Sequence, residues 1–360
     1  MHVTNKKMAL TFLFSLLLLS IITTPGVART KQDAIHDFID KTKQDLGFKD
    51  SVQNKTAAVI PTARVIQLAS FINYKLPDNA DLYYFFQAHQ NSDGGFGNVE
   101  GEESDFNTTI QALYGLLGLR TNVSILIHWG AIEYLNETLS NRIYYNQTIG
   151  NTTTLVHRTN ITSSELVSIS NFIKVANVFS FAWNFNTTLL IKQALDLQFK
   201  NGSYASLLDA EAAITLLDLF SLTPTDVYGA TQYLLSLRKD KSGFSAIHES
   251  PPSIATTYKI LGLLDILGFE FDQLENKADL VKYILDHQDS TGGFFEEEVP
   301  TPTIKTTYYA IISLFLLDSL SELQQKEFIV SEGFVSLQLS ILYFLPILFI
   351  PLIRKRKNKD

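Results

Sequence analysis

Two carboxylates, Asp209 and Glu211, lie two positions apart in an otherwise apolar stretch of this sequence, and a third, Asp105, follows an acidic segment. Glycosidases use paired carboxylates as general acid and as base or nucleophile, so these side chains are candidates for that chemistry. The separation of the two groups decides the reaction, and the sequence does not give it. The alternative is that they stabilise the starts of helices beside a cavity, where negative charge is favoured.

Two further acidic clusters could bind a hard cation such as Ca²⁺, which takes several carboxylate ligands. One contains Glu100, Glu102 and Glu103, and the other is the run from Glu296 to Glu298. Neither has the Asp-x-Asp-x-Asp-Gly spacing of a calcium loop. Solvated loops are therefore the preferred interpretation.

Other chemistry is limited by the composition. The seven histidines are scattered and the chain has no cysteine, which excludes disulfides, thiolate catalysis and cysteine-ligated zinc. No Ser-His-Asp arrangement and no phosphate-binding glycine loop can be recognised. The net charge is −8 and there is no basic stripe before the last residues, so we expect no nucleic-acid partner.

Both ends of the chain carry signals for export and membrane attachment. Residues 1–28 combine Lys6 and Lys7, an apolar run and a small residue at Ala28, which predicts a secretory signal peptide. An uncleaved anchor is the alternative. Residues 334–353 carry no charge and are long enough to span a bilayer, after a linker at 321–333. The basic tail, 354–360, predicts a single-pass protein of the cell membrane with its bulk outside. A C-terminal sorting signal that is removed after export would look the same.

The acceptor sequence for N-glycosylation occurs nine times, where chance predicts about three. This excess favours export. The candidate sites are Asn54, Asn107, Asn122, Asn136, Asn146, Asn151, Asn160, Asn186 and Asn201.

An internal repeat organises the chain. Its skeleton is Tyr-Ile-x3-Gln-x3-Gly-x-Phe between Tyr283 and Phe294, followed by two threonines and an apolar run. The spacing from Phe to the second Thr is thirteen positions in three copies: Phe96 to Thr109, Phe244 to Thr257 and Phe294 to Thr307.

The repeats predict six helical hairpins, at 31–74, 79–119, 122–181, 186–222, 224–268 and 272–319. Each hairpin has apolar faces that only its neighbours can bury. Six hairpins can close into a ring with one helix of each pair inside. We therefore expect an all-α fold, an (α/α)6 toroid over residues 29–320, in which an Asn/Thr-rich loop at 136–162 makes the third hairpin degenerate.

The skeleton resembles the repeat of protein prenyltransferase β subunits and of the squalene–hopene cyclase class. The resemblance covers about residues 31–320 and implies a toroid. The motif residues themselves are interpreted as structural: the Gly allows a tight reversal at positive φ, and the Gln can bind the backbone of the next unit. The matching positions are Gln90, Gly94 and Phe96, then Gln198, Gly202 and Tyr204, then Gln288, Gly292 and Phe294.

Prenyltransferases of this kind hold zinc with an Asp-x-Cys pair on one inner helix and a His on the next. The resemblance places Asp209 at the Asp, Glu211 at the Cys and Ala255 at the His. Asp209 and Glu211 are thus the remaining metal candidates, with His248 as a distant third ligand. We expect no zinc and no other cofactor, because a thiolate and an imidazole are replaced. The acidic run with which cyclases protonate an alkene is also absent.

The starts of the inner helices should line the ring's centre, which makes Thr256, Tyr258, Thr306 and Tyr308 cavity candidates. Aromatics with hydroxyls suit an apolar or amphiphilic ligand, although core packing and helix capping would use the same residues. The leading hypothesis is a non-catalytic binding module for an apolar ligand, a glycan or a protein. The alternative is a divergent enzyme on the same fold, either a lipid- or terpenoid-modifying transferase or cyclase, or a carbohydrate-active enzyme.

Overall fold

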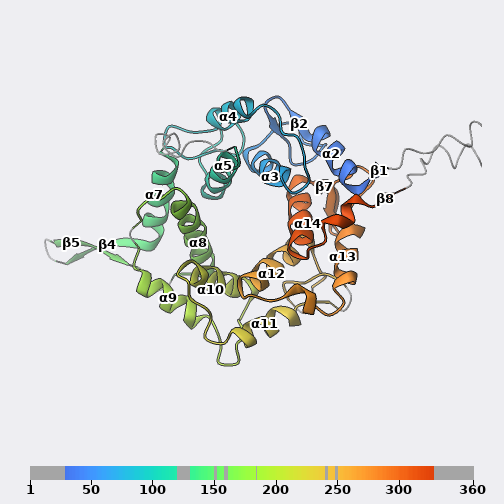
Figure 1. The fold of residues 1–360 in the computed structure, drawn as a ribbon. Coiled ribbons are helices and arrows are strands. Elements are labelled where there is room, and N and C mark those ends of the chain that lie inside the picture. Colours follow the sequence, from blue (N-terminus) through green and yellow to red (C-terminus); the bar gives the residue numbers. More distant parts are fainter. Residues whose placement is uncertain are drawn as a thin grey trace, which may run out of the picture. The chain divides into compact units, whose positions relative to one another are not determined.

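The computed structural model describes residues 29–119, 130–149, 152–157, 161–183, 185–239, 242–247 and 250–327. By its internal contacts the chain divides into residues 32–322 and a second unit made of 1–31 with 323–360. The larger unit is a ring of helices in two layers (Figure 1).

Twelve α-helices are present in the described residues, alternating between the layers along the chain (Figure 1). The inner helices are α3 (Val59–Ala69), α5 (Phe106–Gly118), α8 (Ser163–Val178), α10 (Leu207–Leu219), α12 (Ile254–Ile266) and α14 (Ile304–Leu316). The outer helices are α2 (Lys31–Thr42), α4 (Asn79–Ala88), α7 (Ala131–Ile143), α9 (Thr187–Asp196), α11 (Val227–Ser236) and α13 (Lys277–Asp286). Each inner helix packs on the next, and α14 packs on α3, so the ring closes. The predicted toroid of helical hairpins is confirmed.

The inner helices begin with polar caps that leave their apolar residues for packing. Asp105, Thr162, Ser206, Ser253 and Thr303 each accept a hydrogen bond from an amide in the first turn. Such caps stabilise a helix by about 1 kcal/mol. In α5, α12 and α14 the helix begins two residues before the first of the paired threonines, which were expected at the helix starts.

The constant spacing of thirteen positions has a direct cause. In each copy the amide of the Phe donates to the hydroxyl of the second Thr, and both groups are buried. The distances are 2.9 Å for Phe96 to Thr109, 3.0 Å for Phe244 to Thr257 and 3.0 Å for Phe294 to Thr307. The first hairpin forms the same bond with one more residue in its loop, from Phe48 to Thr62 at 2.9 Å. A fixed loop length is needed because a buried amide without an acceptor is costly.

The Gln and Gly positions form the joint that follows three of the outer helices, α4, α9 and α13. The Gln amide donates to the Gly carbonyl at 3.0 Å, and the Gly has φ of 87°, 80° or 99°. Gln198 also bonds the backbone N–H and C=O of Asp226 in the next hairpin. Arg238 replaces the Gln in the fifth hairpin and donates to the carbonyls of Glu275 and Asn276. The structural interpretation of the motif is confirmed.

The ring is closed by contacts between the sixth hairpin and the first. The amides of Ile304 and Lys305 donate to the backbone carbonyl and the carboxylate of Asp50, at 2.6 Å and 3.1 Å. Gly292 lies so close to the backbone of Ala34 that an added Cβ would be 1.8 Å from the Ala34 carbonyl oxygen.

The main departure from an all-α prediction is the segment expected to be a long loop at 136–162. Helix α7 continues to Ile143, and β4 (Tyr144–Ile149) then pairs antiparallel with β5 (Thr152–His157), a hairpin that projects outward (Figure 1). Its β-branched and aromatic residues favour strands. Shorter pairs join β2 (Lys43–Gln44) to β3 (Gly47–Phe48) and β6 (Phe294–Glu296) to β7 (Val299–Thr303), and η1 (Phe271–Gln273) precedes α13.

In the second unit, β1 (Arg29–Thr30) pairs antiparallel with β8 (Lys326–Glu327). The short helix η2 (Leu320–Gln324) spans the boundary between the two units and overlaps the start of the stretch expected to be a linker. The predicted signal peptide and the predicted span at 334–353 lie outside the described residues. Within the part of the chain that the structure describes, no helix has the length and apolar character needed to cross a bilayer.

Candidate functional site

Asp209 lies in the first turn of α10, where its carboxylate is engaged on both sides. It accepts hydrogen bonds from the hydroxyls of Ser163 and Ser206, the second at 2.8 Å, and its own amide donates to Ser206 at 3.1 Å. Asp209 thus ties the start of α8 to the start of α10. Its carboxylate thereby holds in place the hydroxyl of Ser206, the residue that caps α10.

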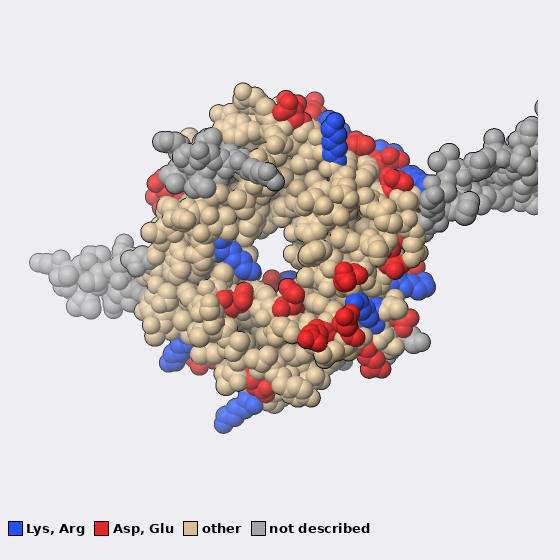
Figure 2. All heavy atoms as spheres, in the orientation of Figure 1, with Lys and Arg blue, Asp and Glu red and all other residues tan. Residues whose placement is uncertain are grey.

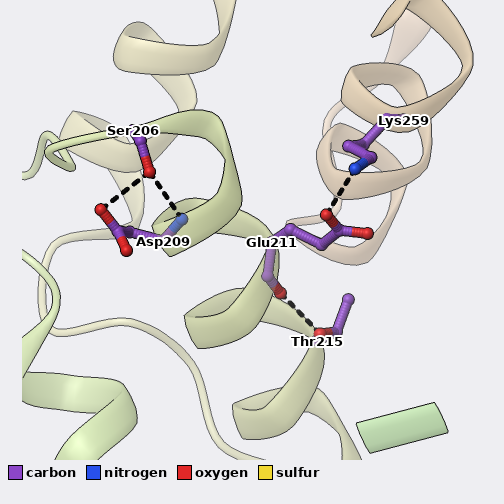
Figure 3. A network of polar contacts seen from close by, with 5 residues as sticks. All are labelled: Ser206, Asp209, Glu211, Thr215 and Lys259. Atoms are coloured by element: carbon purple, nitrogen blue, oxygen red, sulfur yellow. Dashed lines mark hydrogen bonds and ion pairs between the residues drawn. The ribbon is translucent and has the colours of Figure 1, made fainter. Parts of the chain in front are cut away.

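Glu211 points away from Asp209 and toward α12 (Figure 3). Its carboxylate forms an ion pair with Lys259 at 2.6 Å, and the Glu211 side chain is 18% exposed. The two carboxylates that are neighbours in sequence therefore do not converge on one point.

The position that the resemblance assigns to a histidine is Ala255. The amides of Ile254 and Ala255 both donate to the Glu296 carboxylate, at 2.9 Å each, so the start of α12 is capped by a side chain from β6. The residues present do not fit zinc: Asp209 is bound by two serines, Glu211 is paired with an ammonium, and no donor side chain stands at 255. Among the described residues, no group of three or more His, Asp or Glu side chains could hold a metal ion, and His248 lies outside them.

The other acidic candidates also have separate roles. Asp105 caps α5 through the amide of Thr108 at 2.8 Å. Glu102 is exposed and accepts from the amide of Val99 at 3.1 Å.

A cavity of about 360 Å³ lies at the centre of the ring, where Figure 2 shows the molecule hollowed. Five of the six inner helices line it, so it belongs to the ring as a whole. Its walls are polar and aromatic: Arg64, Gln67, Gln111, Tyr114, Asn171, Lys174, Tyr258, Tyr308 and Tyr309. No carboxylate is among them. A wider depression of about 930 Å³ lies on the outside around Arg238, whose guanidinium is already bound to carbonyl groups.

The aromatic wall comes mainly from α12 and α14. The rings of Tyr258 and Tyr309 are stacked, with centroids 4.6 Å apart and planes at 18°. The Arg64 guanidinium lies 5.4 Å from the centroid of Tyr309. Burial raises the pKa of Tyr258 and Tyr308, and it raises the pKa of Tyr114 to about 12. These hydroxyls are therefore protonated at neutral pH and can donate hydrogen bonds.

The positive charge of the wall comes from Arg64 and Lys174. Neither side chain forms a hydrogen bond or an ion pair with the described residues, apart from the contact of Arg64 with Tyr309. Burial lowers the pKa of Lys174, although the negative charges of Asp218 and Glu211 act in the opposite direction. An anion in the cavity would stabilise the protonated lysine.

The structure divides the four predicted cavity residues. Tyr258 and Tyr308 line the cavity, whereas the hydroxyls of Thr256 and Thr306 bond the capping residues at the helix starts. Sequence reasoning missed the polar wall entirely. The sequence does contain a pattern that indicates this wall: in three apolar helices, two polar residues stand three positions apart. Residues with this spacing lie on one face of a helix. The pairs are Arg64 with Gln67, Gln111 with Tyr114, and Asn171 with Lys174.

The glycosylation candidates are partly described. Asn54, Asn107, Asn186 and Asn201 are exposed, and Asn136 is half-buried on α7. Asn186 caps α9 through its side-chain oxygen, which leaves its amide nitrogen, the atom that a glycan modifies. The side chains of Asn122, Asn146, Asn151 and Asn160 lie outside the described residues.

A closed two-layer ring of helical hairpins with a central cavity defines the α/α toroid class. The chain belongs to the prenyltransferase alpha-alpha toroid domain family, whose model matches residues 1–155 and 207–330. No curated protein matches the sequence.

Solved structures with the same fold are distant in sequence. Protein geranylgeranyltransferase-I of Candida albicans, complexed with GGPP, is 15% identical with a TM-score of 0.57, covering 77% of this chain and 90% of that one. The type II terpene cyclase MstE of Scytonema, in its apo form, is 12% identical with a TM-score of 0.51, covering 81% and 97%. A variant of that cyclase in complex with its substrate, geranylgeranyl dihydroxybenzoate, has the same values. At this identity the likeness shows the fold alone.

Proposed function

We propose that this protein is a non-catalytic binding module whose ring centre takes up a small anionic ligand. The observation that carries the proposal is the unpaired positive charge of Arg64 and Lys174 in a cavity whose lining contains no carboxylate. Both residues are half-buried, so their charges are partly removed from water, which is costly, and a bound anion offsets that cost by charge-assisted hydrogen bonds.

The loss of catalysis is supported by the positions that would hold the family's zinc. Glu211 stands at the position of the family's cysteine ligand. The ammonium group of Lys259 pairs with its carboxylate there. The Asp209 carboxylate accepts a hydrogen bond from the Ser206 hydroxyl. The first amides of α12 donate to the Glu296 carboxylate.

Titration calorimetry of the full chain with inorganic phosphate, diphosphate, hexanoate and glucuronate tests the proposal. We expect at least one of these anions to bind with a stoichiometry of one. Arg64→Gln and Lys174→Gln should each weaken that anion at least tenfold, and Lys192→Gln on the exposed side of α9 should not. The absence of binding by every anion, or equal losses in all three variants, would sink the proposal.

The pH dependence of binding gives a second test. Protonated Lys174 attracts the anion and neutral Lys174 does not, and burial lowers the pKa of this lysine. Affinity should therefore fall as pH rises through that lowered pKa, and the Lys174→Gln variant should lose this pH dependence.

A divergent terpenoid-modifying enzyme is the second candidate, because four tyrosine rings line the cavity and aromatic faces stabilise cations. Incubation of the full chain with geranylgeranyl diphosphate, with and without Mg²⁺ or Zn²⁺, separates the two. A product whose formation is lost in Asp209→Ala would refute the non-catalytic proposal.

We also propose that the ring is exported and held at the cell membrane by residues 334–353. The support is the apolar length of this segment and the basic tail behind it. Ending the chain at residue 333 should release the protein from washed membranes, and glycosidase treatment of the released protein should reduce its mass. Retention of the shortened chain in the membrane fraction would contradict the tether.

A further inference from the structure

The central cavity is also lined by uncharged amide side chains that can form hydrogen bonds. The Gln67 side chain accepts a hydrogen bond from the Tyr308 hydroxyl at 3.2 Å, but its buried amide nitrogen has no partner among the described residues. Gln111 and Asn171 also form no hydrogen bond to described residues. Native proteins leave few buried polar groups unpaired. Of the three side chains, only Gln67 has a nitrogen that is buried without a described partner, whereas the half-buried amides of Gln111 and Asn171 are open to hydrogen bonds from the cavity. Together with two cations, these amides indicate a ligand that carries several hydrogen-bonding groups.

The aromatic wall indicates a ligand with apolar C–H groups. Tyr258 and Tyr309 are stacked on each other, and the Arg64 guanidinium lies over the ring of Tyr309. The tyrosine rings are half-buried. A saturated ring can place its C–H groups against their exposed parts while a carboxylate on its edge reaches the guanidinium.

The size and polarity of the cavity argue against a long hydrocarbon chain. Its volume of about 360 Å³ is near the lower end of the range of about 300–1,000 Å³ for ligand pockets. An isoprenoid chain would remove water from Arg64, Lys174 and the three amides without replacing its hydrogen bonds, which is unfavourable.

Resting on the proposed anion-binding function, we infer that the ligand is an acidic sugar, a pyranose ring that carries a carboxylate. The carboxylate meets Arg64 and Lys174, the hydroxyls meet the amides of Gln67, Gln111 and Asn171, and the ring face lies on the tyrosines.

Calorimetry with four matched probes tests this inference on the full chain. Glucuronate carries the ring, the hydroxyls and the charge; glucose lacks the charge; cyclohexanecarboxylate lacks the hydroxyls; and phosphate lacks the ring. We expect glucuronate to bind at least tenfold more tightly than each of the other three. If cyclohexanecarboxylate or phosphate binds as tightly as glucuronate, the inference is overturned while anion binding stands. If no anion binds, both fail.

The free sugar and the end of a glycan share this chemistry, and methyl glucuronide separates them. Binding of glucuronate and of its methyl glycoside assigns the cavity to a glycan end, and binding of the free acid alone assigns it to a free sugar acid. Either result supports the inference, provided that the preference over the other three probes holds.

The variant Gln67→Leu separates the hydroxyl contacts from the charge. It should weaken glucuronate at least fivefold and leave the affinity for cyclohexanecarboxylate within twofold. Gln232→Leu, on the exposed side of α11, is the matched control and should change neither. An unchanged affinity for glucuronate in a folded Gln67→Leu protein, as judged by its thermal transition, would overturn the inference.

Discussion

Ring closure can be tested at Gly292, where two separate effects exclude any side chain. Gly292 has φ of 99°, and an added Cβ would lie 1.8 Å from the carbonyl oxygen of Ala34. Gly101 provides a matched control, because its φ of 83° is similar and no atom lies within 4 Å of its added Cβ. The variants Gly292→Ala and Gly101→Ala therefore share the backbone strain and differ in the clash.

The expected magnitudes follow from these two terms. A left-handed backbone costs an L-residue about 1–2 kcal/mol, which is the whole effect expected for Gly101→Ala. Overpacking adds about 1–3 kcal/mol, so Gly292→Ala should cost about 2–5 kcal/mol. The clash is with main-chain atoms of Ala34, so Ala34→Gly should not relieve it.

Thermal unfolding followed by circular dichroism measures the difference. Gly292→Ala should lower the Tm by at least about 4 °C, and more than Gly101→Ala does. Equal Tm values for the two alanine variants, or rescue of Gly292→Ala by Ala34→Gly, would refute the close approach as the reason for the glycine.

Three further predictions concern the joints and the inner wall. Thr257→Val removes the acceptor of the buried Phe244 amide, so it should lower the free energy of unfolding in urea by about 1–3 kcal/mol. Thr257→Ser keeps the acceptor and should lower it less. A serine variant as unstable as the valine variant would contradict this. Tyr114 holds its proton to a pKa of about 12, above its ordinary value of 10.0, so its stabilising contribution is complete below pH 10.0 and is lost as pH rises through about 12. Tyr114→Phe should therefore flatten the fall in Tm across that window, and an unchanged slope would count against it. Lys259→Met leaves Glu211 unpaired, but Lys259 is 38% exposed, so a double-mutant cycle with Glu211→Gln should give a coupling of only about 0.5–1 kcal/mol; zero coupling would show that the pair is not formed in solution.

Side chains on the inner helices determine the character of the ring centre in this protein. The inner helices bury apolar residues against their neighbours, as in any two-layer ring, but turn Arg64, Gln67, Asn171 and Lys174 inward. These residues make the centre of this ring hydrophilic. The fold supplies a cavity, and the inward side chains decide what enters it.

The sequence by itself determined the architecture, because the repeat is a local device. A Gln, a Gly at positive φ and a Phe–Thr bond across thirteen positions specify one joint, and the copies that retain parts of this joint set the period of the hairpins. The outward hairpin at β4–β5 escaped prediction because the Asn residues of this segment favour loops, whereas its Thr and Tyr residues favour strands.

Only the tertiary structure decided where the chemistry could lie. Asp209 and Glu211 are neighbours in sequence, yet one turns to Ser206 and the other to Lys259, 48 positions further along the chain. Arg64 and Lys174 belong to different hairpins and have no shared motif, yet they line one cavity. The physical reason is that a joint is made by residues close in sequence, whereas a ring centre is made by one face of each inner helix, and closure of the ring sets which side chains meet there.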